Sequence, residues 1–260
     1  MEISFQLGEW MNHRLKKKSA HSIHSPFLFD WYQIVYKGKL QEDIIANYRR
    51  LKKEIKNDHQ TLFHQDFGAG SKKVKTSKPT ISQLASASLK SESEAALIAR
   101  TADYFQARKI LEFGTSFGLT TALLAMVNPD AEIITLEGSE AVAQRASMIF
   151  DQLPQHGIRQ IISQFDLAIE QKSLEEYGPF DMMIIDGNHR MKPTLHYFDY
   201  LLDFCSEDAV FVFDDIRWSK EMLNAWKIIS SHPRITLALD MFGMGIGFLN
   251  PDLSKEYYFI

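Results

Sequence analysis

The sequence predicts an α/β fold built on a doubly wound, mostly parallel sheet, with a helical extension before it. From residue 109 onwards, short apolar runs alternate with helical patterns, which is typical of a parallel sheet covered by helices. A turn with two glycines, Gly114 and Gly118, joins the first of these runs to the helix that follows it. The last two apolar runs, 234–240 and 245–249, are joined by a link too short for a parallel crossover, so they predict an antiparallel hairpin.

Five parallel strands are expected before the hairpin, because each apolar run is short and ends at a glycine, an acid or another turn residue. They span 109–113, 132–137, 160–163, 180–186 and 209–214. Helices are expected between and after them, from 118–120 onwards and over 139–153, 167–176, 193–204 and 219–230.

Residues 1–80 predict an N-terminal helical cap followed by a loop, and residues 81–260 predict the sheet domain. Ser25 before Pro26 is a helix start signal, and Ser91 with Glu94 matches a capping box. The polar segment 58–80, rich in Gly, Ser and Lys, predicts a long loop. Helices are expected in this half over 3–18, 26–36, 42–57, 81–89 and 91–105.

The composition of the 260 residues, 45% hydrophobic and 24% charged, is that of an ordinary globular protein. The single cysteine, Cys205, cannot form an internal disulfide, which favours a reducing compartment and a packing role for its side chain. No signal peptide pattern and no apolar stretch of bilayer-spanning length is present in the sequence. We therefore expect a cytoplasmic protein without a membrane partner.

Positive charge is concentrated near the N-terminus, where residues 1–80 hold 15 of the 29 Lys and Arg but only 8 of the 33 Asp and Glu. Such a balance can attract an anionic substrate or nucleic acid. Aromatic residues are not interleaved with the basic runs, so solvated helix faces are the favoured interpretation and nucleic acid is not the expected partner. The aromatic stripe of 26–36 is a candidate for substrate contacts or a homodimer interface.

The glycine turn predicts a nucleotide-like cofactor, although its glycines are four residues apart and do not match G-x-G-x-x-G. Glu112 lies two residues before Gly114, and a carboxylate at the end of an apolar strand is costly unless it meets a donor. Glu137 ends the second strand, about 20 residues further on, where an acid can hydrogen-bond ribose hydroxyls. These features favour an adenosine-containing cofactor, either a dinucleotide or another adenosine derivative.

Acids end several of the expected strands, and the carboxyl ends of parallel strands form one edge where ligands bind. Single acids at such ends are often helix caps, but a gathering of like charges needs a cation or hydrogen-bond donors. Carboxylate ligands without cysteine suit Mg²⁺. The candidate metal ligands are Asp186, Asp214 and Asp215.

The pattern E-x-G-x-x-x-G-x-T from Glu112 to Thr120 resembles motif I of the class I methyltransferases that use S-adenosylmethionine (SAM). The acids Asp186, Asp214 and Asp215 make the chain similar to metal-dependent O-methyltransferases of the catechol, caffeoyl-CoA and macrocin sugar types. The N-terminal sequence His-Ser-Ile-His-Ser-Pro-Phe resembles uncharacterised bacterial members. The resemblance implies a Rossmann-like sheet of order 3-2-1-4-5-7-6, SAM as cofactor, Mg²⁺ as the divalent metal and a small-molecule acceptor.

The resemblance also implies roles for individual residues. Glu137 would hold the ribose, Phe165 and Asp166 would flank the adenine, and Asp186 would serve both cofactor and metal. The residues expected around the methionine part of SAM are Glu112, Gly114, Thr115, Ser116, Gly118 and Thr120.

The catalytic base does not follow from the resemblance, because Asn188 stands where the sugar type has an acid and no lysine stands close behind Asp186. His189 is the candidate base, since histidine titrates near neutral pH, and orientation of Asp214 or Asp215 is its alternative role. Lys192 is a weaker candidate. The function expected is metal-dependent O-methylation of a small-molecule hydroxyl; methylation of RNA or another macromolecule and non-catalytic SAM binding are the alternatives.

Overall fold

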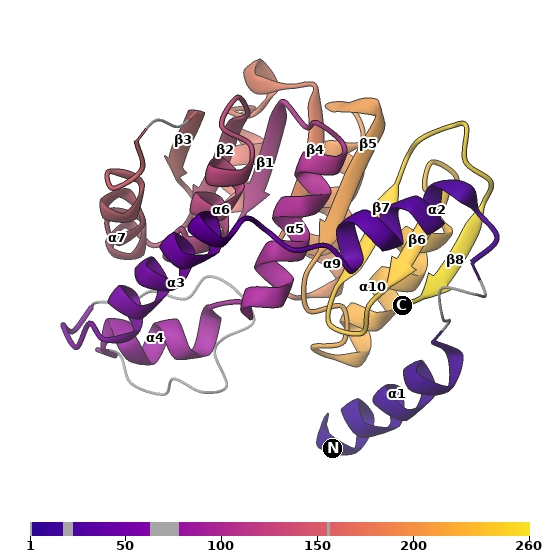
Figure 1. Cartoon of the computed structure of the whole chain (residues 1–260), viewed down its shortest axis with the longest axis horizontal. Coiled ribbons are helices and arrows are strands. Elements are labelled where there is room, and N and C mark those ends of the chain that lie inside the picture. The colour runs from indigo at the N-terminus through magenta and orange to yellow at the C-terminus, as the bar shows by residue number, and fades with distance from the viewer. Residues whose placement is uncertain (1, 18–22, 63–77, 155–156) are drawn as a thin grey trace.

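An eight-stranded mixed sheet is the centre of the computed structural model, which describes residues 2–17, 23–62, 78–154 and 157–260 (Figure 1). The strand order is β3-β2-β1-β4-β5-β7-β6-β8. β1 to β5 are parallel, whereas β7 runs antiparallel to β5 and to β6. The strands are β1 Lys109–Phe113, β2 Glu132–Glu137, β3 Gly157–Ile162, β4 Phe180–Ile185, β5 Cys205–Phe213, β6 Leu237–Asp240, β7 Gly245–Phe248 and β8 Glu256–Phe259.

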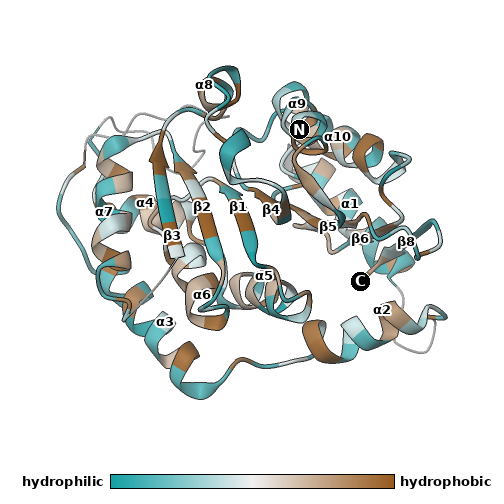
Figure 2. Cartoon of the chain, turned by 90° about the horizontal axis from the view of Figure 1, so that it is seen from above, coloured by the Kyte–Doolittle hydropathy of each residue, from teal (hydrophilic) through white to brown (hydrophobic). Residues whose placement is uncertain are grey.

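Helices cover both faces of this sheet, as Figure 2 shows from above. The helices α2, α3, α5 and α6 lie on one face, and α8, α9 and α10 lie on the other. The α-helices are α1 Glu2–Lys16, α2 Pro26–Trp31, α3 Glu42–Lys56, α4 Ile81–Ser88, α5 Glu92–Tyr104, α6 Leu119–Val127, α7 Glu140–Phe150, α8 Phe165–Glu170, α9 Met191–Leu201 and α10 Lys220–Ser231. A π-helical turn, Tyr32–Tyr36, extends α2, and a 3₁₀ turn, Glu175–Tyr177, precedes β4.

Hydrogen bonds between neighbouring strands align the ends of β1, β4 and β5. The amide of Asp186, just after β4, donates to the carbonyl of Phe113 at 2.8 Å. The amide of Asp214, just after β5, donates to the carbonyl of Ile185 at 3.0 Å. The residues that follow these three strands therefore lie next to one another at one edge of the sheet.

The predicted α/β class, the five parallel strands, the closing hairpin and the order 3-2-1-4-5-7-6 are confirmed. The strand β8 was not expected; it pairs in parallel with β6 and extends the sheet by one strand. Its four residues carry too little pattern to be recognised without the exposed edge of β6 beside them.

Several element boundaries differ from the predicted ones, among them the starts of β3, β5, α8 and β6, which begins at Leu237. β3 begins at Gly157, because it pairs with β2 from Glu132 onwards, and pairing outweighs the weak local pattern. β5 begins at Cys205, whose half-buried side chain lies at a strand start. α8 begins at Phe165, so this residue opens the helix.

The N-terminal helices share an apolar cluster with the sheet, which includes Trp31 of α2, Leu51 of α3 and Phe248 of β7. A boundary between residues 80 and 81 stays a prediction. Most of the loop expected over 58–80 falls on residues 63–77, which lie outside the described residues; Thr61 and Thr80 pair on either side of them. Among the helices of the described ranges, none combines the length and apolar character needed to cross a bilayer.

A buried ion pair fixes the last strands to the loop after β5. The guanidinium of Arg217 donates to both carboxylate oxygens of Asp240, at 2.6 and 2.8 Å, and the Tyr257 hydroxyl donates to one of them at 2.6 Å. His13 of α1 lies 3.0 Å from the carbonyl of Asp240. Burial would raise the pKa of Asp240, but the hydrogen bonds from His13, Arg217 and Tyr257 outweigh it and hold this pKa well below its usual range.

We expect Asp240→Asn to lower the free energy of unfolding by about 3 kcal/mol at neutral pH, because it removes the carboxylate that binds two guanidinium nitrogens of the buried Arg217. The wild-type advantage should be complete above the usual pKa of an aspartate and should decline as the pH falls from there towards the depressed pKa of the folded state. Denaturant unfolding of both proteins across this range measures the effect. Asp199→Asn, at an exposed carboxylate of α9, is the control, and equal losses in the two variants would contradict a special role for Asp240.

Candidate functional site

The glycine turn after β1 approaches the end of β4 so closely that only glycine fits. Gly114 has φ +108°, and a Cβ there would lie 2.0 Å from the carbonyl oxygen of Asp186. Gly118, at φ +73°, is the N-cap of α6, and a Cβ there would lie 2.6 Å from the Phe150 ring. Ser116 between them also has a left-handed backbone, at φ 49°. The turn is therefore held in one conformation, with backbone exposed at the ligand edge.

Glu112 lies beneath this turn rather than on its surface. Its side chain is 1% exposed, and one carboxylate oxygen accepts from the hydroxyls of Thr121, at 2.5 Å, and Thr135, at 2.6 Å. Thr115 is buried in the same group, 2.6 Å from the Thr135 hydroxyl. The hydrogen-bond donors that a buried Glu112 needs are thus the hydroxyls of two threonines. Glu112 supports the glycine turn from beneath.

Glu137 lies at the end of β2 and is fixed by two backbone amides. One carboxylate oxygen accepts from Ser116 at 2.9 Å, and the other accepts from Ser139 at 2.9 Å. The carboxylate is half-buried at the edge of the sheet, next to the glycine turn. A carboxylate oxygen accepts more than one hydrogen bond, which suits this group to the hydroxyls of a ligand.

Aromatic rings form a wall beyond the ends of β1 and β4. Phe165 stacks on Phe113, with ring centroids 4.9 Å apart, and meets Tyr197 edge to face at 5.8 Å. A Cβ on Gly187 would lie 2.6 Å from the Phe165 ring. Asp166 is exposed at the first turn of α8, and Thr120 is half-buried in the first turn of α6.

Asn188 lies behind this wall with an unusual backbone and an unsatisfied oxygen. Its φ is 65°, and its amide nitrogen donates to the Tyr197 hydroxyl at 2.9 Å. Its Oδ1 is buried and, among the described residues, has no hydrogen-bond partner. A buried acceptor of this kind is a position for a ligand donor.

A lysine that was not expected in the site, Lys90, bridges the acids after β4 and β5. Its Nζ lies 2.8 Å from Oδ2 of Asp186 and donates to Oδ2 of Asp214. The side chains are largely buried, with 5% of Lys90, 19% of Asp186 and 17% of Asp214 exposed. The cation that offsets these carboxylates is therefore part of the chain.

Lys90, Asp186 and Asp214 form an ion triad, and the charge interactions within it shift all three pKa values. Burial disfavours the charged form of Lys90, but the two carboxylates outweigh burial and raise its pKa. Burial raises the pKa of Asp186 well above its usual range, against the opposing charge of Lys90. On Asp214 the charge and hydrogen bond of Lys90 outweigh burial, so its pKa is lowered. Lys90 is therefore an ammonium ion at neutral pH, paired first with the ionised Asp214.

The three predicted metal ligands, Asp186, Asp214 and Asp215, do not converge on one position in the described structure. Asp215 has φ 52° and turns towards His189, with 3.8 Å between Oδ2 of Asp215 and Nε2 of His189. Within the described residues, no group of three His, Cys, Asp or Glu side chains could hold a metal ion. The side chains present do not fit a divalent ion, because the ammonium of Lys90 already lies between the two acids that face each other.

His189 and Lys192 differ in their access to this site. His189, 21% exposed, lies between Asp215 and the Trp218 ring, whose centroid is 5.9 Å from that of the imidazole. Lys192 is exposed on the first turn of α9. The geometry keeps His189 as the candidate base and gives Lys192 no contact with the triad.

Sequence reasoning missed Lys90 and Tyr197. Lys90 is the one residue between the C-cap of α4, Leu89, and the N-cap of α5, Ser91. A single lysine between two helices is ordinarily a solvated residue, so no local signal separates it from the other lysines. The only signal in the sequence was the excess of acids at the strand ends, because gathered carboxylates need a positive charge that compensates them.

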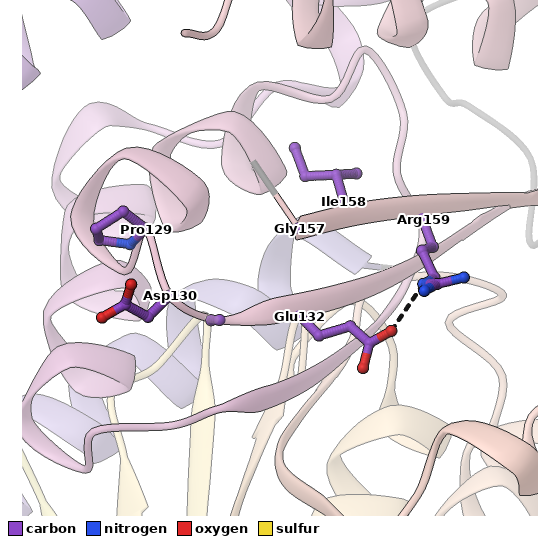
Figure 3. Close-up of a pocket in the computed structure, with 7 residues that line it drawn as sticks. Pro129, Asp130, Glu132, Gly157, Ile158 and Arg159 are labelled. Carbon is purple, nitrogen blue, oxygen red and sulfur yellow. Dashed lines mark ion pairs between the residues drawn. The ribbon is translucent and has the colours of Figure 1, made fainter. Parts of the chain in front are cut away.

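A surface hollow shown in Figure 3 lies at the opposite edge of the sheet, at the amino ends of β2 and β3. It is lined by Pro129, Asp130, Ala131, Glu132, Gly157, Ile158 and Arg159. Glu132 and Arg159 form an ion pair across it at 2.7 Å. Ligands of parallel α/β sheets bind at the carboxyl ends, so the hollow is separate from the candidate site.

A comparison with known protein families finds a match for the segment that contains these strand ends. Residues 111–216 match a family model described as a methyltransferase domain. The segment is similar to a methyltransferase domain over less than half of the chain. It includes the glycine turn, Glu137, Asp186, Asp214 and Asp215, while Lys90 lies outside it. No curated protein matches the sequence.

Solved structures share the fold of most of the chain. An O-methyltransferase from Bacillus cereus in complex with SAH has a TM-score of 0.57 at 16% identity, covering 85% of this chain and 96% of its own. TomG from Streptomyces achromogenes, an O-methyltransferase in complex with SAM, has 0.57 at 17% identity, covering 86% and 95%. SAH-bound PaMTH1 from Podospora anserina has 0.57 at 16% identity, covering 86% and 96%. The chain therefore shares its fold with these O-methyltransferases.

We expect Gly114→Ala to lower the free energy of unfolding by about 2 kcal/mol or more, because the new Cβ meets the Asp186 carbonyl and the backbone is left-handed. Gly8→Ala in α1 is the matched control, since no atom lies within 4 Å of a Cβ there. Thermal and denaturant unfolding compare the two. If Gly114→Ala lowered the free energy of unfolding no more than Gly8→Ala does, the turn would have to be able to move away from β4.

We expect Glu112 to make stability depend on pH, because burial raises its pKa from 4.5 to about 7. The unfolded chain ionises this group first, so its contribution is present below pH 4.5 and is lost as the pH rises to about 7. Glu112→Gln should remove a decline of roughly 3 kcal/mol over this interval. Unfolding free energies of both proteins, measured across the interval, give the difference; parallel curves would contradict the assignment.

Proposed function

We propose that the protein is a SAM-dependent methyltransferase that methylates a hydroxyl oxygen of a small molecule. The observation that carries the proposal is the combination of the Gly114 turn with Glu137, held at the same edge as Asp186 within the segment that matches a methyltransferase domain. The O-methyltransferases that share the fold were solved with SAM or SAH, which supports the same cofactor here.

Several features of the site fit SAM. Gly114 and Gly118 carry no side chain that would obstruct the methionine part, and the carboxylate of Glu137 is an acceptor for ribose hydroxyls. Phe165 supplies an aromatic face for adenine, and the unpaired Oδ1 of Asn188 is an acceptor for a ligand N–H. When bound, SAM supplies an electrophilic methyl group.

The residues after β4 and β5 are proposed to prepare the acceptor. His189 is half-buried beside Asp215 and takes the proton from the acceptor hydroxyl, and the Asp215 carboxylate stabilises the imidazolium that results. The positive charge of Lys90 lies at the same edge and favours the developing oxyanion. The divalent metal expected from the sequence has no part in this proposal, because the side chains do not fit it.

We expect calorimetry to show SAM binding to the wild-type chain and an affinity about tenfold lower for Glu137→Gln, which loses a charged hydrogen-bond acceptor for the ribose. Glu132→Gln is the matched control, since it lies at the opposite end of the same strand. Release of SAH with a panel of hydroxylated small molecules then tests the reaction.

The outcomes separate the alternatives. No SAM binding would overturn the proposal, and equal affinities in the two variants would place the ribose elsewhere. Methyl transfer to RNA alone in the same assay would assign a macromolecular acceptor instead.

A further inference from the structure

The ammonium of Lys90 lies where the strand-end acids would otherwise have to share a metal ion. It contacts Asp186 at 2.8 Å and also donates to Asp214, and only 5% of its side chain is exposed. A buried lysine is expensive unless it is paired and hydrogen-bonded, and here two carboxylates meet that requirement. The contact is therefore a built feature of the fold.

The chain holds Lys90 in place from both sides. Thr80 and Gln83 form a capping box at the start of α4, and Ser91 and Glu94 form another at the start of α5. The second box fixes the start of α5 directly after Lys90. The Lys52 ammonium of α3 donates to the carbonyl of Lys90 at 2.6 Å.

A further contact fixes this linker against the glycine turn. The hydroxyl of Ser88, at the end of α4, lies 3.1 Å from the hydroxyl of Ser116. The segment that carries Lys90 is thus attached both to α3 and to the turn where the cofactor is proposed to bind. These contacts fix the backbone from which the Lys90 side chain reaches the two acids.

A divalent ion between Asp186 and Asp214 would meet the fixed ammonium. Both acids direct an oxygen at Nζ, and Mg²⁺ needs six oxygen ligands at about 2.0–2.1 Å. Asp215, the third acid after these strands, is turned to His189. Repulsion between the two cations opposes metal binding between Asp186 and Asp214.

We propose that Lys90 takes the place of the divalent metal ion, so that the methyl-transfer site works with a positive charge supplied by the chain. This inference rests on the proposed function for its catalytic meaning. A metal holds two acceptor oxygens by chelation, whereas an ammonium offers hydrogen bonds without that geometric demand. The acceptor therefore does not need a second oxygen beside the methylated one.

The test is binding of Mn²⁺ alone to the full chain, followed by electron paramagnetic resonance of the free ion. The wild type should show no one-to-one Mn²⁺ site, because Lys90 fills the position. Lys90→Ala removes the ammonium and leaves Asp186 and Asp214 facing each other, so its Mn²⁺ affinity should rise at least about tenfold. Lys227→Ala, which removes an exposed lysine of α10, should behave like the wild type.

Circular dichroism shows whether Lys90→Ala folds, and Lys90→Gln is the second variant to be measured if it does not. Lys90→Gln keeps hydrogen-bond donors between the acids and should also gain Mn²⁺ binding. A wild-type Mn²⁺ site that disappears in Asp214→Asn would overturn the proposal, and so would folded Lys90 variants that bind no more Mn²⁺ than the wild type.

Calorimetry with SAM in the presence of EDTA separates this inference from the proposed function. Unchanged SAM binding after chelation is expected. Failure to bind SAM under any condition would remove the proposed function, while the Mn²⁺ measurement would still decide whether Lys90 fills the cation position.

Discussion

The ion triad of Lys90, Asp186 and Asp214 is the constraint on which the ligand edge depends. Parallel pairing of β4 with β5 places the two acids side by side, and at low dielectric their charges repel. A cation between them is needed for both to remain there. Because that cation comes from the linker between α4 and α5, the N-terminal helices and the sheet have to be assembled together for the site to exist.

Two glutamates at the same turn illustrate how environment assigns roles to identical side chains. Glu112 is buried against threonine hydroxyls, and burial raises its pKa, so it supports the turn. Glu137 accepts backbone amides on both oxygens and stays half-buried at the edge, where it can reach a ligand. Sequence position alone, two acids at two strand ends, does not separate these roles.

A second buried ion pair, Arg217 with Asp240, differs from the triad in its balance of charge. There, both oxygens of one buried carboxylate, Asp240, bind the same guanidinium, and the Tyr257 hydroxyl adds a hydrogen bond; the second acid near Arg217, Glu9, lies 3.6 Å away. At the triad, one cation meets two carboxylates, and His189 and Asp215 lie close by. Groups with strongly shifted and coupled pKa values gather at this edge, as is common at functional sites.

The sequence by itself determined the strands of the sheet, the glycine turn and the edge where the acids gather, because apolar periodicity and turn chemistry are local properties. The residue ranges of β1 and β2 were predicted correctly, and so was the position of Asp186 and Asp214 next to each other at one edge of the sheet. The tertiary structure alone decided the partner of those acids, the buried state of Glu112, the pairing of β8 and the turn of Asp215 towards His189. Lys90 is separated from Asp186 by almost a hundred residues, and only the packing of α4 and α5 against the sheet brings its charge between the strand ends.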